Sequence, residues 1–197
     1  MESKQGHKYL SIKSAGRKLI WKHGIRRINV DDICSEAGVS RMTFYKYFRN
    51  KNELALDVLQ TFYDESMKRY EEIMKSEVEF PEKARQLILM KIEGTNDLSK
   101  EFVTDIFNMQ ASELSTWYHK IYQDFLERLV EDLNAAQKKG EIRKDLKIEF
   151  VLYFMGKTYE MATDTSLLSH YNSPQEMIVE LINFFFYGIM PVKGRTK

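Results

Sequence analysis

The sequence predicts an all-α fold, and three observations lead to it. Apolar residues recur at intervals of three and four along most of the chain, which is the period of an amphipathic helix. The 197 residues include only 9 Gly and 3 Pro, too few for the many tight turns of a β-sandwich or β-barrel. Hydrophobic residues make up 43% of the chain, enough to build a packed core. We therefore expect about nine helices, divided between an N-terminal domain, 1–51, and a larger C-terminal domain, 52–197.

The two expected domains carry opposite charge. Residues 1–51 hold 12 Lys and Arg against 4 Asp and Glu, a net charge of +8. Residues 52–197 hold 18 basic and 25 acidic residues, a net charge of −7. A basic head on an acidic body is typical of proteins that bind polyanions, although a solvated basic terminus is an alternative. The pattern inside the head decides between them.

The head contains the start and stop signals of three helices. The first helix has an apolar face formed by Ile12, Ala15, Gly16, Leu19 and Ile20. It ends at Gly24, where a backbone with positive φ is commonly needed. Asn29 is placed to cap a short second helix, 31–37, which Gly38 ends. Ser40 is placed to cap a third helix. Two short helices joined by a turn with glycine form a helix-turn-helix.

The third helix, expected to run to about Phe48, has two faces of different chemistry. Phe44 and Phe48 share one face and are expected to pack on the first two helices. The opposite face and its flanks carry Met42, Thr43, Tyr45, Lys46 and Tyr47. Arg41 lies in the first turn. Arginine and hydroxyl groups read base edges, whereas Tyr and Lys more often contact phosphate oxygens, so this helix is expected to bind DNA.

Residues 28–51 read INVDDICSEAGVSRMTFYKYFRNK. This stretch resembles the DNA-binding domain of TetR-family transcriptional regulators, above all through Ala-Gly-Val-Ser at 37–40 and Thr-Phe-Tyr-x-Tyr-Phe at 43–48. The resemblance implies that the third helix contacts DNA and that Lys51, at the start of a fourth helix, holds a phosphate, as a helix N-terminus also favours. The predicted DNA-binding residues are Asn29, Ser40, Arg41, Met42, Thr43, Tyr45, Lys46, Tyr47 and Lys51.

The acidic body continues the helical pattern to its end. The periodicity and the Gly and Pro positions predict helices over about 52–76, 81–94, 99–111, 118–140, 147–168 and 174–188. The last of these opens with Ser-Pro-Gln-Glu at 173–176, a capping box with Pro in the first turn. We see no domain of another class and no repeat.

The last predicted helix is apolar nearly all round, which one small chain cannot easily bury. It is therefore either the central core helix or half of a subunit interface. Helix-turn-helix proteins commonly bind DNA as dimers, and the resemblance implies a homodimer formed through the last two helices of each chain. The predicted interface residues are Ile178, Leu181, Ile182, Phe185 and Ile189.

Aromatic and methionine side chains in the body are candidates for a ligand pocket. They are Tyr63, Met67, Met90, Phe107, Trp117, Tyr118, Tyr122, Phe125, Tyr153 and Tyr159. Each has the alternative of being ordinary core, and only the resemblance supports a cavity. The ligand that it implies is a small apolar or amphipathic molecule of unknown identity.

Other functions find little support in the sequence. The histidines His7, His23, His119 and His170 are scattered without metal-ligand spacing, and Cys34 is the single cysteine. We expect no metal, no cofactor and no catalytic residues, because phosphate-loop and nucleophile-elbow motifs are also missing. No apolar run reaches the length of a membrane span, and the start of the chain is polar, so we expect no membrane association and a cytoplasmic location.

The sequence thus predicts a homodimeric, TetR-like transcriptional repressor that binds a palindromic operator in double-stranded DNA and is released by its ligand. One alternative is a helix-turn-helix regulator without a small-molecule effector. The other is an all-α ligand-binding or catalytic protein whose basic head is incidental.

Overall fold

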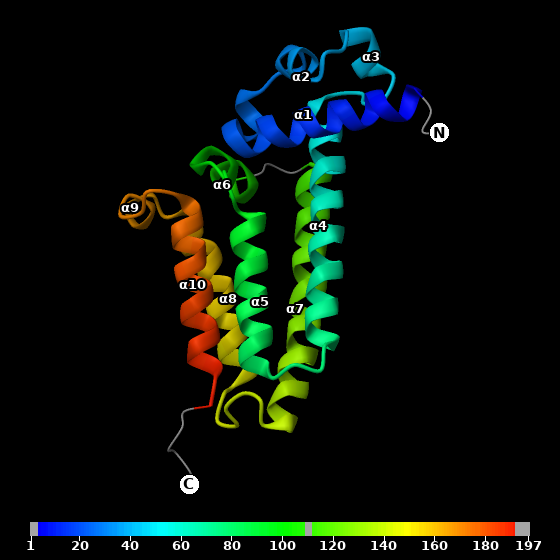
Figure 1. Ribbon diagram of the computed structural model, residues 1–197. Helices are drawn as coiled ribbons and strands as arrows, with labels where there is room; N and C mark the ends of the chain where they lie inside the picture. Colours follow the sequence, from blue (N-terminus) through cyan, green and yellow to red (C-terminus); the bar gives the residue numbers. More distant parts are fainter. Residues whose placement is uncertain (1–3, 109–111, 192–197) are drawn as a thin grey trace. The chain divides into compact units, whose positions relative to one another are not determined.

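The computed structural model describes residues 4–108 and 112–191, and every regular element in these ranges is a helix, which confirms the predicted all-α class (Figure 1). The helices are α1 (Lys4–Arg27), α2 (Val30–Ala37), α3 (Arg41–Tyr45), α4 (Lys51–Lys75), α5 (Phe80–Gly94), α6 (Lys100–Phe107), α7 (Glu113–Lys139), α8 (Ile148–Thr163), α9 (Thr165–Leu168) and α10 (Pro174–Ile189). No helix of the described residues combines the length and the apolar character that a membrane span needs.

The chain divides into two compact units. Unit 1 comprises Met1–Glu65 and Asp97–Thr116, and unit 2 comprises Ser66–Asn96 and Trp117–Lys197. Unit 1 therefore holds α1, α2, α3 and α6 together with the first part of α4 and the first turn of α7, while the rest of these two helices belongs to unit 2. Because α4 has a long segment in each unit, it is the first element to consider when one unit must respond to the other.

The local signals at the start of the chain set the geometry of unit 1. Gly24 has φ 78°, as its predicted role requires, and the helix direction breaks there. Asn29 and Asp32 form a reciprocal capping box at the start of α2. Gly38 ends α2 in the left-handed conformation with φ 65°. These three turns fix the directions in which α2 and α3 leave α1.

The third helix is shorter than predicted. It ends at Tyr45 rather than near Phe48, because the chain tightens into a turn whose bonds span three residues. The amide of Lys46 donates to the carbonyl of Thr43 at 3.3 Å, and the amide of Tyr47 donates to that of Phe44 at 2.9 Å. Phe48 still reaches the core through this turn and is 4% exposed.

Unit 2 is a layered helical bundle. Its main core joins Phe80 and Ala84 of α5 to Leu129, Leu133 and Ala136 of α7. Residues of α8 and α10 complete that core, and a smaller cluster lies between α4 and α5.

The sequence predicted one helix over 147–168, which is wrong. Asp164 adopts an extended backbone and its carboxylate caps a separate short helix, α9, so the described residues contain one more helix than the nine predicted.

Candidate nucleic-acid interface

The outer face of α3 is exposed while its inner face is locked into the core. Phe44 is fully buried, and its ring packs against that of Phe48 at 5.8 Å, as predicted from their spacing. On the other side Met42 is 75% exposed and Tyr45 is 55% exposed. Lys46, in the turn that follows, is also exposed. Met42, Tyr45 and Lys46 are therefore all accessible to a partner from the outer side of α3.

Arg41 is held by an acid of the neighbouring helix. Its Nε and Nη2 donate to the two carboxylate oxygens of Asp31 in the first turn of α2. Both side chains are exposed, so neither charge needs the other as a partner in order to be buried. The two-point contact fixes the guanidinium plane beside the start of α3, and it also occupies donors that a base or a phosphate would need.

Asn29 and Ser40, also predicted to bind DNA, use their side chains to build the motif itself. The Asn29 side-chain oxygen accepts the amides of Asp31 at 2.8 Å and Asp32 at 3.0 Å. The Ser40 hydroxyl oxygen accepts the amide of Thr43 at 3.2 Å and lies 3.1 Å from the Thr43 hydroxyl. Both residues therefore position α2 and α3, and any contact they make with DNA stays a prediction.

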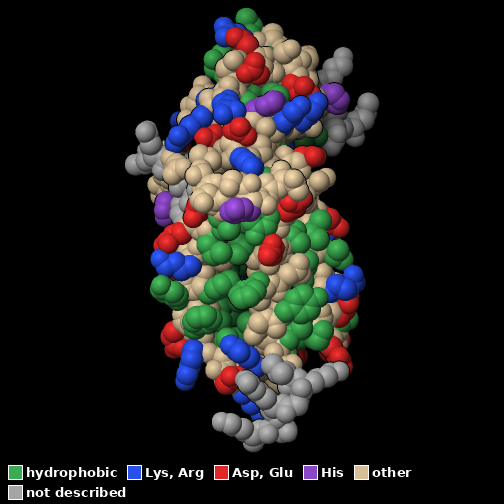
Figure 2. All heavy atoms as spheres, turned by 90° about the vertical axis from the view of Figure 1, so that its left-hand side faces the viewer, with side chains coloured by type: hydrophobic (Ala, Val, Ile, Leu, Met, Phe, Trp, Pro, Cys, Tyr) green, Lys and Arg blue, Asp and Glu red, His purple; other side chains and the backbone are tan. Residues whose placement is uncertain are grey.

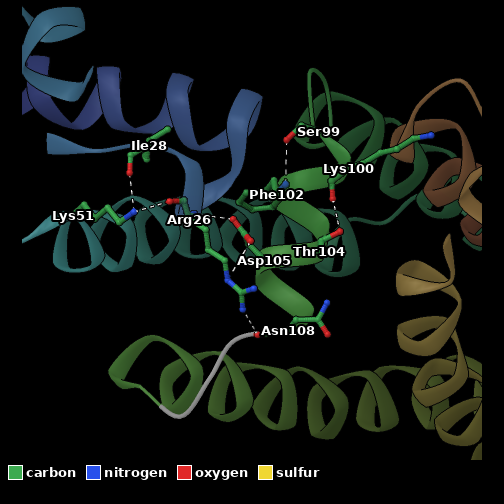
Figure 3. Close-up of polar contacts among 9 residues, drawn as sticks. All are labelled: Arg26, Ile28, Lys51, Ser99, Lys100, Phe102, Thr104, Asp105 and Asn108. Carbon is green, nitrogen blue, oxygen red and sulfur yellow. Dashed lines mark hydrogen bonds and ion pairs between the residues drawn. The ribbon is translucent and has the colours of Figure 1, made fainter. Parts of the chain in front are cut away.

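Lys51 ties the start of α4 to the end of α1. Its Nζ donates to the carbonyl oxygens of Arg26 at 3.0 Å and Ile28 at 2.7 Å (Figure 3). Desolvation lowers the pKa of this amine. The ammonium has three protons and these carbonyls take two, which leaves one for the predicted phosphate contact. Lys51 thus has a structural role that its sequence position did not reveal.

Tyr47 is supported by residues that the sequence reasoning missed. Its ring lies 6.1 Å from that of Tyr9 on α1, and the Tyr9 hydroxyl donates to the Asp57 carboxylate at 2.8 Å. Lys13 makes an ion pair with the same carboxylate at 3.0 Å. Because these contacts join residues of α1 and α4 that are far apart in the sequence, no local pattern predicts them.

A second joint in unit 1 connects α6 to the end of α1 (Figure 3). One Asp105 carboxylate oxygen accepts the backbone amide of Arg26 at 2.9 Å, and the other lies 3.5 Å from the Arg26 Nε. A Cβ on Gly24 would lie 2.5 Å from the Asp105 carboxylate, so only glycine allows this approach. The amide of Ser99 donates to the carbonyl of Trp21 at 3.0 Å. The end of α1 is therefore held by the Asp105 carboxylate of α6 and by the main chain of Ser99, which caps that helix.

Residues 12–58, which contain the helix-turn-helix and its capping geometry, match the model of the family described as "Bacterial regulatory proteins, tetR family". Residues 12–58 are therefore a DNA-binding domain of the TetR type. Among curated proteins the chain is 23% identical to the uncharacterized HTH-type transcriptional regulator YdgC of Bacillus subtilis, with 85% of each chain covered. It is 24% identical to the HTH-type transcriptional repressor KstR2 of Rhodococcus jostii, covering 71% of this chain and 70% of that protein.

Solved structures agree on the fold. The transcriptional regulator FadR of Bacillus subtilis, determined in complex with stearoyl-CoA, superposes with a TM-score of 0.68 at 20% identity. The match covers 92% of this chain and 99% of FadR. The fold is therefore shared along both units.

The predicted pocket residues have different environments. Met67 and Met90 pack in the cluster around Tyr70 and Leu87, and the rings of Phe125 and Tyr70 are 6.1 Å apart. Trp117, Tyr118 and Tyr122 remain half-buried on α7, and Tyr63 is half-buried in unit 1. Tyr153 does not face inward, since it is 66% exposed on α8. The side chains of Phe107 and Tyr159 lie outside the described residues.

The predicted interface residues need one correction. Ile189 is 3% exposed within a single chain and belongs to the main core of unit 2, so it is not a surface residue of α10. Ile178, Leu181, Ile182 and Phe185 are half-buried. Sequence reasoning missed the side chains that remain most open, because it treated α10 as apolar all round and did not separate its faces.

These open side chains form an aromatic patch on α8 and α10 (Figure 2). We define it as Phe150, Tyr153, Phe154, Phe184 and Tyr187. Phe154 stacks on Phe150 and on Phe184, with ring planes inclined by 29° and 28°. Phe184 is 70% exposed and Tyr187 is 69% exposed. An apolar surface of this kind on a small protein indicates an interaction site.

Proposed function

We propose that this chain is a homodimeric repressor that acts in the cytoplasm, binds a palindromic operator and leaves it when a small apolar or amphipathic ligand binds. The observation that carries the proposal is the exposed outer face of α3, held at a fixed angle by the capped turns before it, in a head with a net charge of +8. The curated relatives are named as transcriptional regulators and not as enzymes.

In this proposal the aromatic patch is the dimer interface. Helices α8 and α10 of two protomers would cover each other's patches about a two-fold axis, as an isologous interface requires. The two α3 helices would then read half-sites separated by about one helical turn of DNA or a multiple of it. Such geometry makes operator affinity depend on residues that never touch DNA.

Ligand release requires that binding in unit 2 alter unit 1. We assign this to α4, which runs through both units, and to α6, whose Asp105 holds the end of α1. A ligand changes operator affinity only through its different affinities for the two conformations, and a thousandfold loss needs about 4 kcal/mol. FadR of Bacillus subtilis, with the same fold, was solved with stearoyl-CoA, which supports a ligand of this general type here.

The decisive experiment measures DNA binding by the full-length protein. Genomic fragments are selected for binding, the protected site is mapped by footprinting, and affinity for that site is compared with random DNA at physiological salt. We expect a palindromic site bound at least about a thousandfold more tightly than random DNA. Equal affinity for both contradicts the proposal. A sequence-specific protein that no apolar or amphipathic compound releases is instead a regulator without a small-molecule effector.

A further inference from the structure

The inner face of α5 changes character at its last turn. Phe80, Ala84 and Leu87 point into unit 2 and are 3%, 0% and 5% exposed. Their spacing of four and three residues continues to Lys91, two helical turns beyond Ala84 and on the same side of the helix. A lysine therefore occupies a position that the pattern reserves for an apolar residue.

Contacts on both flanks show that this face is the inner one. Leu87 and Met90 cluster with Tyr70 of α4, and Phe80 and Ala84 join the core that includes α7. On the remaining side the Gln175 amide, in the first turn of α10, donates to the carbonyl of Ile92 at 2.6 Å. The end of α5 is thus fixed against α10, and the helical spacing puts Lys91 on the side of α5 that carries the buried Ala84 and Leu87.

The amine of Lys91 makes no hydrogen bond or ion pair with any described residue. Other charges of α5 are satisfied: Lys83 donates to the carbonyl of Met74 at 2.9 Å, and Glu93 pairs with Arg69 at 2.7 Å. Desolvation is the sole cause that lowers the pKa of Lys91. Lys91 is nevertheless one of the exposed residues of α5. An exposed lysine that is also desolvated, on the side of the helix that carries Phe80, Ala84 and Leu87, is the combination expected where water enters between helices.

We propose that Lys91 binds the acidic head of an amphipathic ligand whose apolar part lies along Met67, Met90 and Phe125. This rests on the proposed function and narrows its ligand to an anion. An unpaired, desolvated cation weakens the fold, and a ligand carboxylate or phosphate supplies the charge that no described side chain provides. The half-buried aromatic side chains of α7 offer the tail an apolar lining.

The test uses the full-length protein without DNA and ligands that differ only in the head group. Decanoate, decanoyl-CoA and the neutral decanol are titrated by calorimetry and by tryptophan fluorescence. We expect at least one anion to bind about tenfold or more tightly than decanol, because a charge-assisted contact is gained. Preference for decanoate assigns the head to a carboxylate, and preference for decanoyl-CoA alone assigns it to phosphates.

The variants separate the role of Lys91 from general charge. Lys91→Met should bind decanol as the wild type does and lose the preference for the anion, while Lys91→Arg should retain it. Lys68→Met, which removes an exposed lysine of α4, is the matched control and should change neither affinity. Thermal melting of each variant checks that it is folded.

Two results overturn the inference: no anion preferred over decanol by the wild type, or a preference that survives in folded Lys91→Met. The proposed function fails separately. Anions that bind through Lys91 without changing operator affinity contradict ligand release and leave the ligand class standing. Release by decanol alone, with no preference for anions, contradicts the ligand class and leaves ligand release standing.

Discussion

At the scale of single residues, Lys51 has a structural task and is predicted to have a second one, a contact with a DNA phosphate. Its amine holds the carbonyl oxygens of Arg26 and Ile28 and has one proton left for a phosphate. We expect Lys51→Met to weaken binding to all DNA sequences alike and to reduce the slope of log affinity against log salt by about one. It should also lower the free energy of unfolding by about 1–3 kcal/mol, since two carbonyl oxygens lose a charged donor.

The control for this prediction is Lys46→Met. The side chain of Lys46 is exposed and makes no hydrogen bond or ion pair with any described residue, so its removal should flatten the salt slope without loss of stability. Salt-dependent fluorescence anisotropy and urea unfolding measure the two effects. Equal stability losses in both variants would contradict the structural role of Lys51.

Asp31 is expected to compete with DNA for Arg41. Because its carboxylate occupies Nε and Nη2 of that side chain, binding of DNA through Arg41 must first break this exposed pair. Asp31→Asn should tighten binding to random DNA by up to about fivefold, as an exposed pair is worth at most about 1 kcal/mol. Anisotropy at low salt measures this. Weaker binding in the variant would mean that Asp31 orients Arg41 productively rather than restraining it.

Lys91 gives a pH dependence whose sign follows from its environment. Desolvation lowers its pKa in the folded protein, so the unfolded chain binds more protons and stability rises with pH through that interval. Lys91→Met should therefore melt at a higher temperature than the wild type near pH 7. The gap should close above about pH 10.5, where the unfolded lysine is also neutral. Paired melts across this range isolate the effect, and a gap independent of pH contradicts it.

At the scale of elements, the end of α1 depends on α6. Asp105 is 8% exposed and is an acceptor for the Arg26 amide, so Asp105→Ala leaves that amide without its partner. We expect a loss of about 1–3 kcal/mol in unfolding free energy. The control is Glu101→Ala, on α6 like Asp105, which removes the exposed ion pair between Glu101 and Arg27 of α1. This variant should lose less than about 1 kcal/mol of unfolding free energy. Urea midpoints compare them, and equal losses would refute the special role of Asp105.

The helices of this chain were predictable where their signals are local. Asn29, Gly38 and Ser40 predict the turns of the N-terminal domain, because each acts within a few residues of its own position. The burial of Phe44 and Phe48 follows from their spacing of four residues. The contacts of Asp105 with Arg26 and of Lys51 with Ile28 join residues distant in sequence, so no periodicity reports them. Asp164 was read as an interior helix position, whereas its preference for capping divides α8 from α9.

At the scale of the whole molecule, the aromatic patch explains why α10 looked apolar on every side. Ile189 faces the chain's own core, while Phe184 and Tyr187 face away from it. A periodicity argument alone could not assign the two faces, because both are apolar. The face with Ile189 is buried when the chain folds, and the face with Phe184 and Tyr187 is proposed to be buried when two chains form a dimer.

Phe184→Glu should yield a folded monomer. The side chain is 70% exposed in one protomer, so a charge there costs the protomer little, but it would be buried without a partner in the dimer. Sedimentation should show monomer with unchanged helical content, and operator affinity should fall by at least about a hundredfold. Leu89→Glu, at an exposed apolar residue of α5 outside the patch, is the control and should stay dimeric. A dimeric Phe184→Glu variant excludes the patch as the interface.

The continuity of α4 has a consequence for sensitivity. With 25 residues and a rise of about 1.5 Å each, the helix is about 37 Å long. A rod of this length converts a tilt of about 3° at its Lys75 end into a displacement of about 2 Å at Lys51. In the proposed dimer, two protomers that move in opposite directions double this change to about 4 Å between the α3 helices, slightly more than the rise of about 3.4 Å per base pair of DNA. A long unbroken helix thus amplifies a small tilt at one end into a larger displacement at the other. The proposed ligand therefore needs to move only the residues that it contacts by a small distance.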